Sequence, residues 1–256
     1  MVKGLYTSAL GMLTQMQRMD IIADNLANVN TTGFKRDKAA VHSFSEELLK
    51  RIDDPSDQPR HIISMGGISQ GVFIDDIYTV HESGALRKTG GSLDMAVVGD
   101  GFFTVEIPGE DDQATRMYTR DGSFTLDAEG NLITKEGSRV LGEGGVISIP
   151  QGVVTISDEG RIYSNQVYVD TLRMTSFQDT RQLRKQGDNM FSAIEGAEEG
   201  EFTGKITQGF LEASNVNPIR EMTEMITVSR AYDANQRMIV SHDAIMSRTV
   251  NDIARK

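Results

Sequence analysis

The side chains best suited to catalysis or metal binding are thinly spread along this 256-residue chain. Its histidines, His42, His61, His81 and His242, do not have the H-x-x-x-H or H-E-x-x-H spacing by which one helix face presents two imidazoles to a metal. Cysteine is absent, which excludes disulfides, thiolate ligands and cysteine nucleophiles. No G-x-S-x-G or Walker sequence is present. The sequence therefore predicts no catalytic site, no metal and no other cofactor.

Two pairs of acidic residues remain as chemical candidates. Paired carboxylates could serve a glycosidase or bind calcium. Both pairs, however, lie in the turns of expected β-hairpins, Phe124–Thr134 and Val154–Ser164, where Asp and Glu are ordinary residues. The two segments share one pattern, with a glycine where a tight turn needs positive φ, so we expect two hairpins of one design. The four carboxylates are those of Asp127, Glu129, Asp158 and Glu159.

Composition narrows the class of partner. A net charge of −11 argues against nucleic acid, since phosphate binding needs a basic face. No apolar run approaches the roughly 18 residues of a membrane span, and the first residues lack the basic-then-apolar pattern of a cleaved secretory signal. We therefore expect protein partners rather than nucleic acid or membrane.

The elements that dominate the pattern are the two ends of the chain. Apolar residues recur every seven positions, or alternately every four and three, which is typical of helices with one apolar seam packed on another helix. Asn217 is a candidate N-cap followed by Pro218 at the first helical position, and Gly33 can close the N-terminal helix, expected over 1–32. The predicted seam residues are Leu5, Ala9, Met12, Met16, Met19, Ala23, Leu26, Met222, Met225, Tyr232, Ile239, Met246 and Ile253.

The middle of the chain has short β-branched runs divided by Gly and Asp, which predicts strands and turns. We expect an α+β protein in which both terminal helices, in segments 1–36 and 209–256, pair as a coiled-coil core domain. A linker of extended or β structure covers 37–90 with a flexible loop at 53–60, and a β-rich outer domain covers 91–208.

Both helices also carry apolar residues off the seam, such as Leu13 and Ile226. One pair of helices cannot cover all of them, so either the middle domain or other subunits must pack there. The pattern favours other subunits.

Four segments then show a family resemblance, in order along the chain. Asp24–Lys35 (DNLANVNTTGFK) resembles the N-terminal signature of the bacterial flagellar rod and hook protein family. Leu93–Phe103 (LDMAVVGDGFF) is similar to its next shared segment, and Tyr118–Phe124 (YTRDGSF) to its β-domain motif. Gln208–Asn217 (QGFLEASNVN) resembles its C-terminal signature.

The resemblance implies a structural subunit that polymerises into the tubular rod of the flagellar basal body, transmits torque from motor to hook and forms part of the export channel. Its partners would be copies of itself, other rod and hook subunits and the type III export apparatus, which exports the family without a cleaved signal. Contact with peptidoglycan or the surrounding ring proteins stays open. The distal rod type is favoured, with the proximal type next.

The resemblance also assigns turns and caps at the inner ends of the two helices, where side chains bond exposed backbone groups. These residues are Asn25, Asn28, Thr32, Gly33, Phe34, Gly209, Glu212, Ser214, Asn215 and Asn217. Two alternatives remain: a soluble coiled-coil adaptor or chaperone that does not polymerise, and a carbohydrate-active enzyme that uses the acidic hairpins.

Overall fold

Contacts divide the chain into two units, which are described separately. The helical unit comprises residues 1–26, 37–78 and 218–256, and the β unit comprises 27–36 and 79–217. The structure, a computed structural model, describes residues 2–44, 47–51, 63–69, 71–107, 115–194 and 196–254. The loop expected at 53–60 lies outside these residues.

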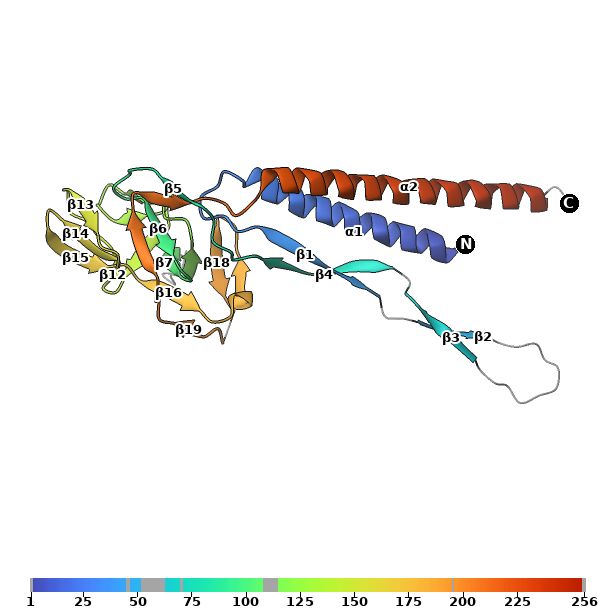
Figure 1. Cartoon of the computed structure of the whole chain (residues 1–256), viewed down its shortest axis with the longest axis horizontal. Helices are drawn as coiled ribbons and strands as arrows, with labels where there is room; N and C mark the ends of the chain where they lie inside the picture. The colour runs from blue at the N-terminus through green and yellow to red at the C-terminus, as the bar shows by residue number, and fades with distance from the viewer. Residues whose placement is uncertain are drawn as a thin grey trace. The chain divides into compact units, whose positions relative to one another are not determined.

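The two long helices are α1, Val2–Ala27, and α2, Pro218–Ala254. In the helical unit they run antiparallel alongside each other, α1 in blue and α2 in red (Figure 1). The start of α2 at Pro218 confirms the expected first position, because proline has a preset φ and lacks only an N–H that the first turn does not use. Neither helix, nor any other in the described residues, is long and apolar enough to cross a membrane.

Helix α1 ends at Ala27, earlier than the expected end at 32. Asn28 redirects the backbone into a turn: its carbonyl accepts from the Thr31 N–H at 3.2 Å, and its side-chain oxygen accepts from the Thr31 hydroxyl at 3.1 Å. Such local bonds compete with helix propagation. Gly33 does take the left-handed conformation, with φ of 66°, but it follows this turn and does not itself cap the helix.

Two antiparallel ribbons complete the helical unit (Figure 1). One pairs β1 (Asp37–Ser43) with β4 (Val72–Thr79), and the other pairs β2 (Glu47–Arg51) with β3 (Ile63–Ile68). The first ribbon is anchored to α1, since Asn25 and the Asp37 backbone exchange two hydrogen bonds of 2.9 Å.

The β unit contains a ten-stranded sheet in the order β17-β18-β8-β7-β11-β10-β9, with β12 paired to β11 and with β16 joining β7 to β19. A three-stranded sheet, β13-β14-β15, and the pairs β6-β20 and β5-β21 accompany it. A 3-10 turn, η1, covers Thr180–Gln182. The strands are β5 Leu86–Lys88, β6 Met95–Val98, β7 Phe102–Ile107, β8 Thr115–Thr119, β9 Thr125–Leu126, β10 Leu132–Ile133, β11 Arg139–Gly142, β12 Gly145–Val146, β13 Val154–Ile156, β14 Arg161–Ser164, β15 Val167–Thr171, β16 Met174–Phe177, β17 Leu183–Lys185, β18 Met190–Ala193, β19 Glu199–Gly200, β20 Lys205–Gln208 and β21 Phe210–Glu212.

The two hairpins expected in Phe124–Thr134 and Val154–Ser164 are confirmed. β9 pairs antiparallel with β10, and β13 pairs antiparallel with β14. Gly130 and Gly160 have φ of 87° and 86°, and their N–H groups donate to the carbonyls of Asp127 at 3.2 Å and Ser157 at 2.9 Å. One turn design therefore recurs because glycine occupies the same strained place in both.

The core of the β unit lies among its sheets. Its centre is mainly aliphatic and includes Phe103, Leu132, Ile162 and Ile206, each with at most 1% of its surface exposed. A neighbouring aromatic cluster is formed by Phe102, Tyr118, Phe177, Leu183 and Phe191. The apolar side chains of the β unit are thus largely buried within the chain itself.

Candidate assembly faces and the signature junction

In the β unit, the segment that follows α1 pairs with the segment that precedes α2. The Gly33 N–H donates to the Glu212 carbonyl at 2.8 Å. The Asn215 side chain accepts from the Arg36 N–H at 2.8 Å and donates to the Val80 carbonyl at 2.8 Å. We call this meeting of residues 28–36 with 209–217 the signature junction.

Gly33 is the tightest point of the signature junction. Besides its positive φ, a Cβ added there would lie 2.5 Å from the Arg120 carbonyl carbon and from the Asp121 nitrogen. These are backbone atoms, which cannot move aside as a side chain can. Any residue other than glycine would therefore displace the turn from the sheet.

A buried ionic cluster lies beside this turn. Lys35 Nζ is 2.6 Å from Glu212 Oε1, and Arg120 Nη1 is 3.5 Å from Glu212 Oε2. All three side chains are at most 2% exposed. Backbone groups add further hydrogen bonds: Gly84 N–H donates to Glu212, Lys35 donates to the Glu82 carbonyl, and Arg120 donates to the Gly99 carbonyl.

Two cations share the one buried carboxylate of this cluster, and the charge of Asp100 also favours the charged forms of both. Burial lowers the pKa of Lys35, and the carboxylate of Glu212 opposes that shift. Burial also lowers the pKa of Arg120, again opposed by Glu212. Glu212 therefore offsets two desolvated charges at once.

The other assigned turn and cap residues have definite places. In the β unit, the Thr32 hydroxyl donates to the Asp121 carboxylate at 2.8 Å, and the Gly209 carbonyl accepts from the Thr89 N–H at 2.9 Å. Lys185 Nζ lies over the ring of Phe34, 3.8 Å from the ring centroid. Ser214 accepts from the Val216 N–H at 3.3 Å.

The assigned residues do not all meet in one place. Asn28 shapes the turn after α1, Asn217 is exposed at the start of α2, and Asn25 belongs to the helical unit. The ionic partners Lys35 and Arg120 were not among the predicted residues. Their signal was a charged residue inside an otherwise apolar or turn-forming motif.

In the helical unit, α1 faces α2 through small and polar residues. Arg18 forms an ion pair with Glu224 at 2.9 Å. A Cβ added to Gly4 would lie 2.9 Å from His242 Nε2, and one added to Gly11 would lie 3.0 Å from Asn235 Nδ2. The contact therefore follows positions 4, 11 and 18, a seven-residue row next to the apolar one.

The predicted seam residues consequently have mixed surroundings. Those that are half-buried are Leu5, Met12, Met19, Leu26, Met225, Tyr232, Ile239 and Met246. Those that are exposed are Ala9, Met16, Ala23 and Met222. Ile253 falls in α2, but its side chain lies outside those described.

A further set of apolar side chains on both helices faces away from this contact. On α1, Tyr6 is 52% exposed and Leu13 47%. On α2, Ile219 is 76% exposed, Ile226 55% and Val240 62%. The exposed apolar side chains on one face of each helix make these faces candidate sites of protein interaction.

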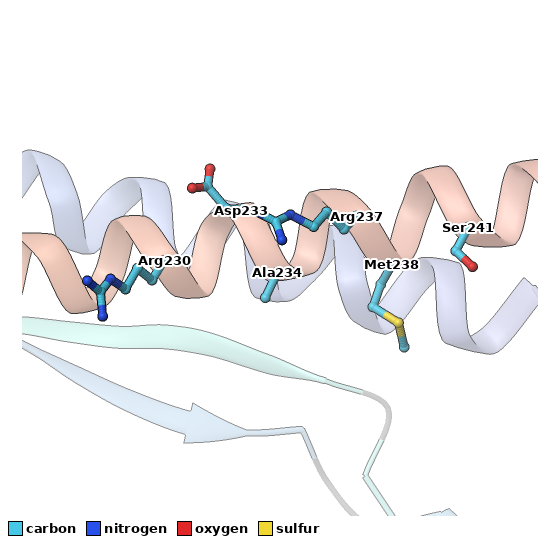
Figure 2. Close-up of a pocket in the computed structure, with 6 residues that line it drawn as sticks. All are labelled: Arg230, Asp233, Ala234, Arg237, Met238 and Ser241. Atoms are coloured by element: carbon cyan, nitrogen blue, oxygen red, sulfur yellow. The ribbon is translucent and has the colours of Figure 1, made fainter.

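A shallow groove of about 570 Å³ lies along α2 (Figure 2). Arg230, Ala234 and Met238 point to one side of the helix there. The full lining is Arg230, Asp233, Ala234, Arg237, Met238 and Ser241. Exposed guanidinium groups beside apolar side chains suit an amphipathic, acidic partner rather than a small molecule.

The carboxylates of Asp127, Glu129 and Glu159 are engaged within their own hairpins. The Asp127 carboxylate accepts from the Asn131 side chain and backbone and from the Glu129 N–H at 2.8–2.9 Å, and these bonds lower its pKa. Glu159 forms an ion pair with Arg161 at 3.1 Å. In the described ranges no three acidic or histidine side chains gather as a metal site would require.

Three stretches match profiles of flagellar proteins. Residues 5–35 match the flagella basal body rod protein, residues 96–164 the flagellar hook protein FlgE/F/G D1 domain, and residues 207–253 the flagellar basal body rod FlgEFG protein C-terminal region.

Relatives that align with nearly the whole chain are also flagellar basal-body rod proteins. The chain is 33% identical to the flagellar basal-body rod protein FlgF of Caulobacter vibrioides, over 97% of this chain and 96% of that one. It is 32% identical to the flagellar basal-body rod protein FlgG of Borreliella burgdorferi, over the whole of both chains. Identity to FlgG of Bacillus subtilis is 32%, over 98% and 99% of the two chains.

Proposed function

Since the chain belongs to the family of flagellar basal-body rod proteins, we propose that it polymerises with copies of itself into the helical tube of the rod. It is a structural subunit of the flagellar basal body, and its family is not an enzyme family. The distal rod type, FlgG, fits its relatives. As part of the tube it would transmit torque from motor to hook and line the export channel.

The observation that supports polymerisation best is the exposed apolar surface of α1 and α2. In the helical unit the contact between these helices uses Gly4, Gly11 and Arg18 on α1, and it leaves Tyr6, Leu13 and Met16 in water. Hydrophobic association of neighbouring copies would remove that surface from water, at roughly 25 cal/mol for each Å².

The predicted seam then acquires a role between subunits. Half-buried residues such as Met12 and Met225 would be covered fully when a neighbouring helix packs on them, which gives the coiled-coil inner layer of the tube. Methionine suits such a place because its flexible side chain fits non-identical neighbours. The β units would form the outer layer.

The signature junction supports the assignment of the two helices to the inner layer and of the β unit to the outer layer. Its ionic cluster fixes the segment after α1 and the segment before α2 to the same place on the β unit, through Lys35, Glu212 and Arg120. We infer that the turn and cap residues set the entry of both helices into the tube and that they do not contact a ligand.

Further partners follow from the same proposal. They are other rod subunits, hook subunits and the type III export apparatus, which would export the chain without a cleaved signal. Its place would be the basal body of the flagellum.

The test is assembly of the purified chain, followed by sedimentation and electron microscopy. Ile226→Asp should reduce the sedimented tube fraction roughly tenfold or more, because a charge replaces an apolar contact. Thr227→Asp, at an exposed position one residue further, is the matched control and should leave assembly intact.

Hydrogen exchange separates this proposal from the adaptor alternative. Amides of α1 and α2 should exchange quickly in the dilute chain and become protected on assembly, since the contact within one chain buries few apolar side chains and an amphipathic helix without such packing is marginal in water. Full protection in a small oligomer of fixed size, with no tubes, would instead support a non-polymerising adaptor.

A further inference from the structure

The exposed face of α1 carries a regular row of residues at alternating spacings of three and four. Every side chain in this row is exposed. The first four side chains of the row are apolar or aromatic, and an acidic side chain follows them. The outer row of α1 is Tyr6, Ala9, Leu13, Met16, Asp20 and Ala23.

Helix α2 carries a second row with the same alternation, and its side chains are exposed as well. Its middle is charged and both its ends are apolar or small. The groove of Figure 2 runs along this middle part. The outer row of α2 is Ile219, Thr223, Ile226, Arg230, Asp233, Arg237, Val240 and Ala244.

The two rows are electrostatically complementary. The outer row of α1 has one charge, that of Asp20, while the row of α2 has two arginines and one aspartate. Among the residues that the structure describes, no ion pair engages Arg230 or Arg237. In a chain of net charge −11, a surface with net positive charge is a local exception that would attract an acidic face of another copy.

Geometry then fixes direction and register. The helices are antiparallel within a chain, so copies that share one direction along a tube bring α1 of one against α2 of the next in antiparallel orientation. Leu13 lies seven residues before Asp20, and Val240 lies seven residues after Asp233. Seven residues span about 10 Å along each helix. With Asp20 placed between Arg230 and Arg237 it lies level with Asp233, whose single charge the two arginines exceed, and Leu13 therefore lies level with Val240.

We infer that the outer row of α1 in one copy docks on the outer row of α2 in a second copy, antiparallel, with Asp20 between Arg230 and Arg237 and Leu13 beside Val240. The inference rests on the proposed polymerisation and names the surfaces that carry it. Because each copy offers two different surfaces, the contact is heterologous and can continue without closing.

Cysteine cross-linking tests the register directly, since the chain contains no cysteine of its own. Leu13→Cys and Val240→Cys are made as separate variants, mixed, assembled and oxidised, so that any product holding both must join two copies. We expect this mixed dimer to exceed the Leu13→Cys homodimer at least fivefold. Thr223→Cys, in the same row but 17 residues away from Val240, is the matched control and should give little mixed dimer.

A double variant checks that the helical unit is intact under these conditions. Gly11→Cys with Asn235→Cys places two thiols at the contact within one chain and should form a disulfide without joining copies. This control separates loss of the inter-copy contact from loss of the helices.

Charge substitution tests the proposed contact of Asp20 with Arg230 and Arg237. Asp20→Asn should lower the yield of mixed dimer about fivefold at low salt, and added salt should reduce the wild-type yield as it screens the contact. Gln17→Lys changes the charge of α1 by the same one unit on a neighbouring exposed position and should have a smaller effect.

The outcomes distinguish the inference from the proposed function. Tubes without a Leu13–Val240 mixed dimer, or with equal dimer from Thr223→Cys, would overturn the docking and leave polymerisation standing. A mixed dimer without tubes would support the docking and contradict polymerisation. Absence of both would overturn both.

Discussion

The two units of this chain treat their apolar residues in opposite ways. In the described part of the helical unit, the fully buried apolar side chains are those of Ile22 and Val228. The β unit, by contrast, buries a continuous core with residues such as Phe103 and Leu132 at no measurable exposure. One unit buries its core within a single chain, and the other keeps apolar surface in water, which in our proposal neighbouring copies cover.

This difference predicts which apolar residues stabilise a single chain and which stabilise the assembly. In the β unit, burial within the chain should set the free energy of unfolding. In the helical unit, residues with equally apolar side chains should matter little to a dilute chain and much to an assembled one. Four substitutions test this contrast.

The largest effect should come from Glu212→Ala. Removal of the carboxylate leaves Lys35 and Arg120 buried without their ion-pair partner, which typically costs about 3–5 kcal/mol. Urea unfolding followed by circular dichroism measures the loss. Glu82→Ala removes a carboxylate that is 72% exposed and 3.6 Å from Arg36, and it should cost at most about 1 kcal/mol. Equal losses would show that burial of the cluster is not what matters.

Leu132→Ala should follow in size. The side chain is fully buried in the core of the β unit, so its truncation should destabilise the folded chain by about 2–5 kcal/mol. Thermal unfolding at fixed pH checks this value. A cost below about 1 kcal/mol would mean that the core of the β unit is looser than its burial indicates.

Tyr118→Phe should have an intermediate effect that depends on pH. Burial and the 2.6 Å hydrogen bond to Glu199 raise the pKa of Tyr118 to about 12. The neutral phenol is therefore favoured in the folded state, so its contribution is complete below pH 10 and is lost as pH rises through about 12.

The wild type should accordingly exceed Tyr118→Phe in stability by about 1.5–3 kcal/mol at pH 8, as expected for a hydrogen bond to a charged group. Denaturant titrations at pH 8 and pH 11.5 test the sign. A difference that grew with pH would contradict it.

The smallest effect on the dilute chain should come from Ile219→Ala. With 76% of the side chain in water, truncation should change the free energy of unfolding by at most about 0.5 kcal/mol. Assembly should nevertheless weaken, measured as a higher critical concentration. If the dilute chain were destabilised as strongly as by Leu132→Ala, the helical unit would already be closed within one copy.

The sequence was informative wherever structure depends on neighbours along the chain. Pro218 marked the start of α2, and Gly130 and Gly160 marked two hairpins, because each of these residues imposes its own backbone geometry. Strand β11 was not predicted, since Val140 and Leu141 alone are too short a signal. It forms because β7 supplies a partner.

The sequence predicted that the two helices pair, but for a related reason it did not predict the residues through which α1 faces α2. A search for apolar periodicity finds Leu5, Met12 and Met19, whereas the row that faces α2 includes Gly4, Gly11 and Arg18. Small residues leave no hydrophobic signal, although they allow two helices to come close. The ionic cluster was equally hidden, because nothing local indicates that Lys35, Arg120 and Glu212 share one site.

That cluster also has a consequence for the order in which the chain folds. Lys35 and Glu212 are 177 positions apart, and Arg120 and Glu212 are 92 apart. A chain that emerges from its N-terminus must hold both cations in water until residue 212 arrives, and contacts of such long range slow folding. The ionic cluster is therefore expected to form late, after most of the β unit has been made.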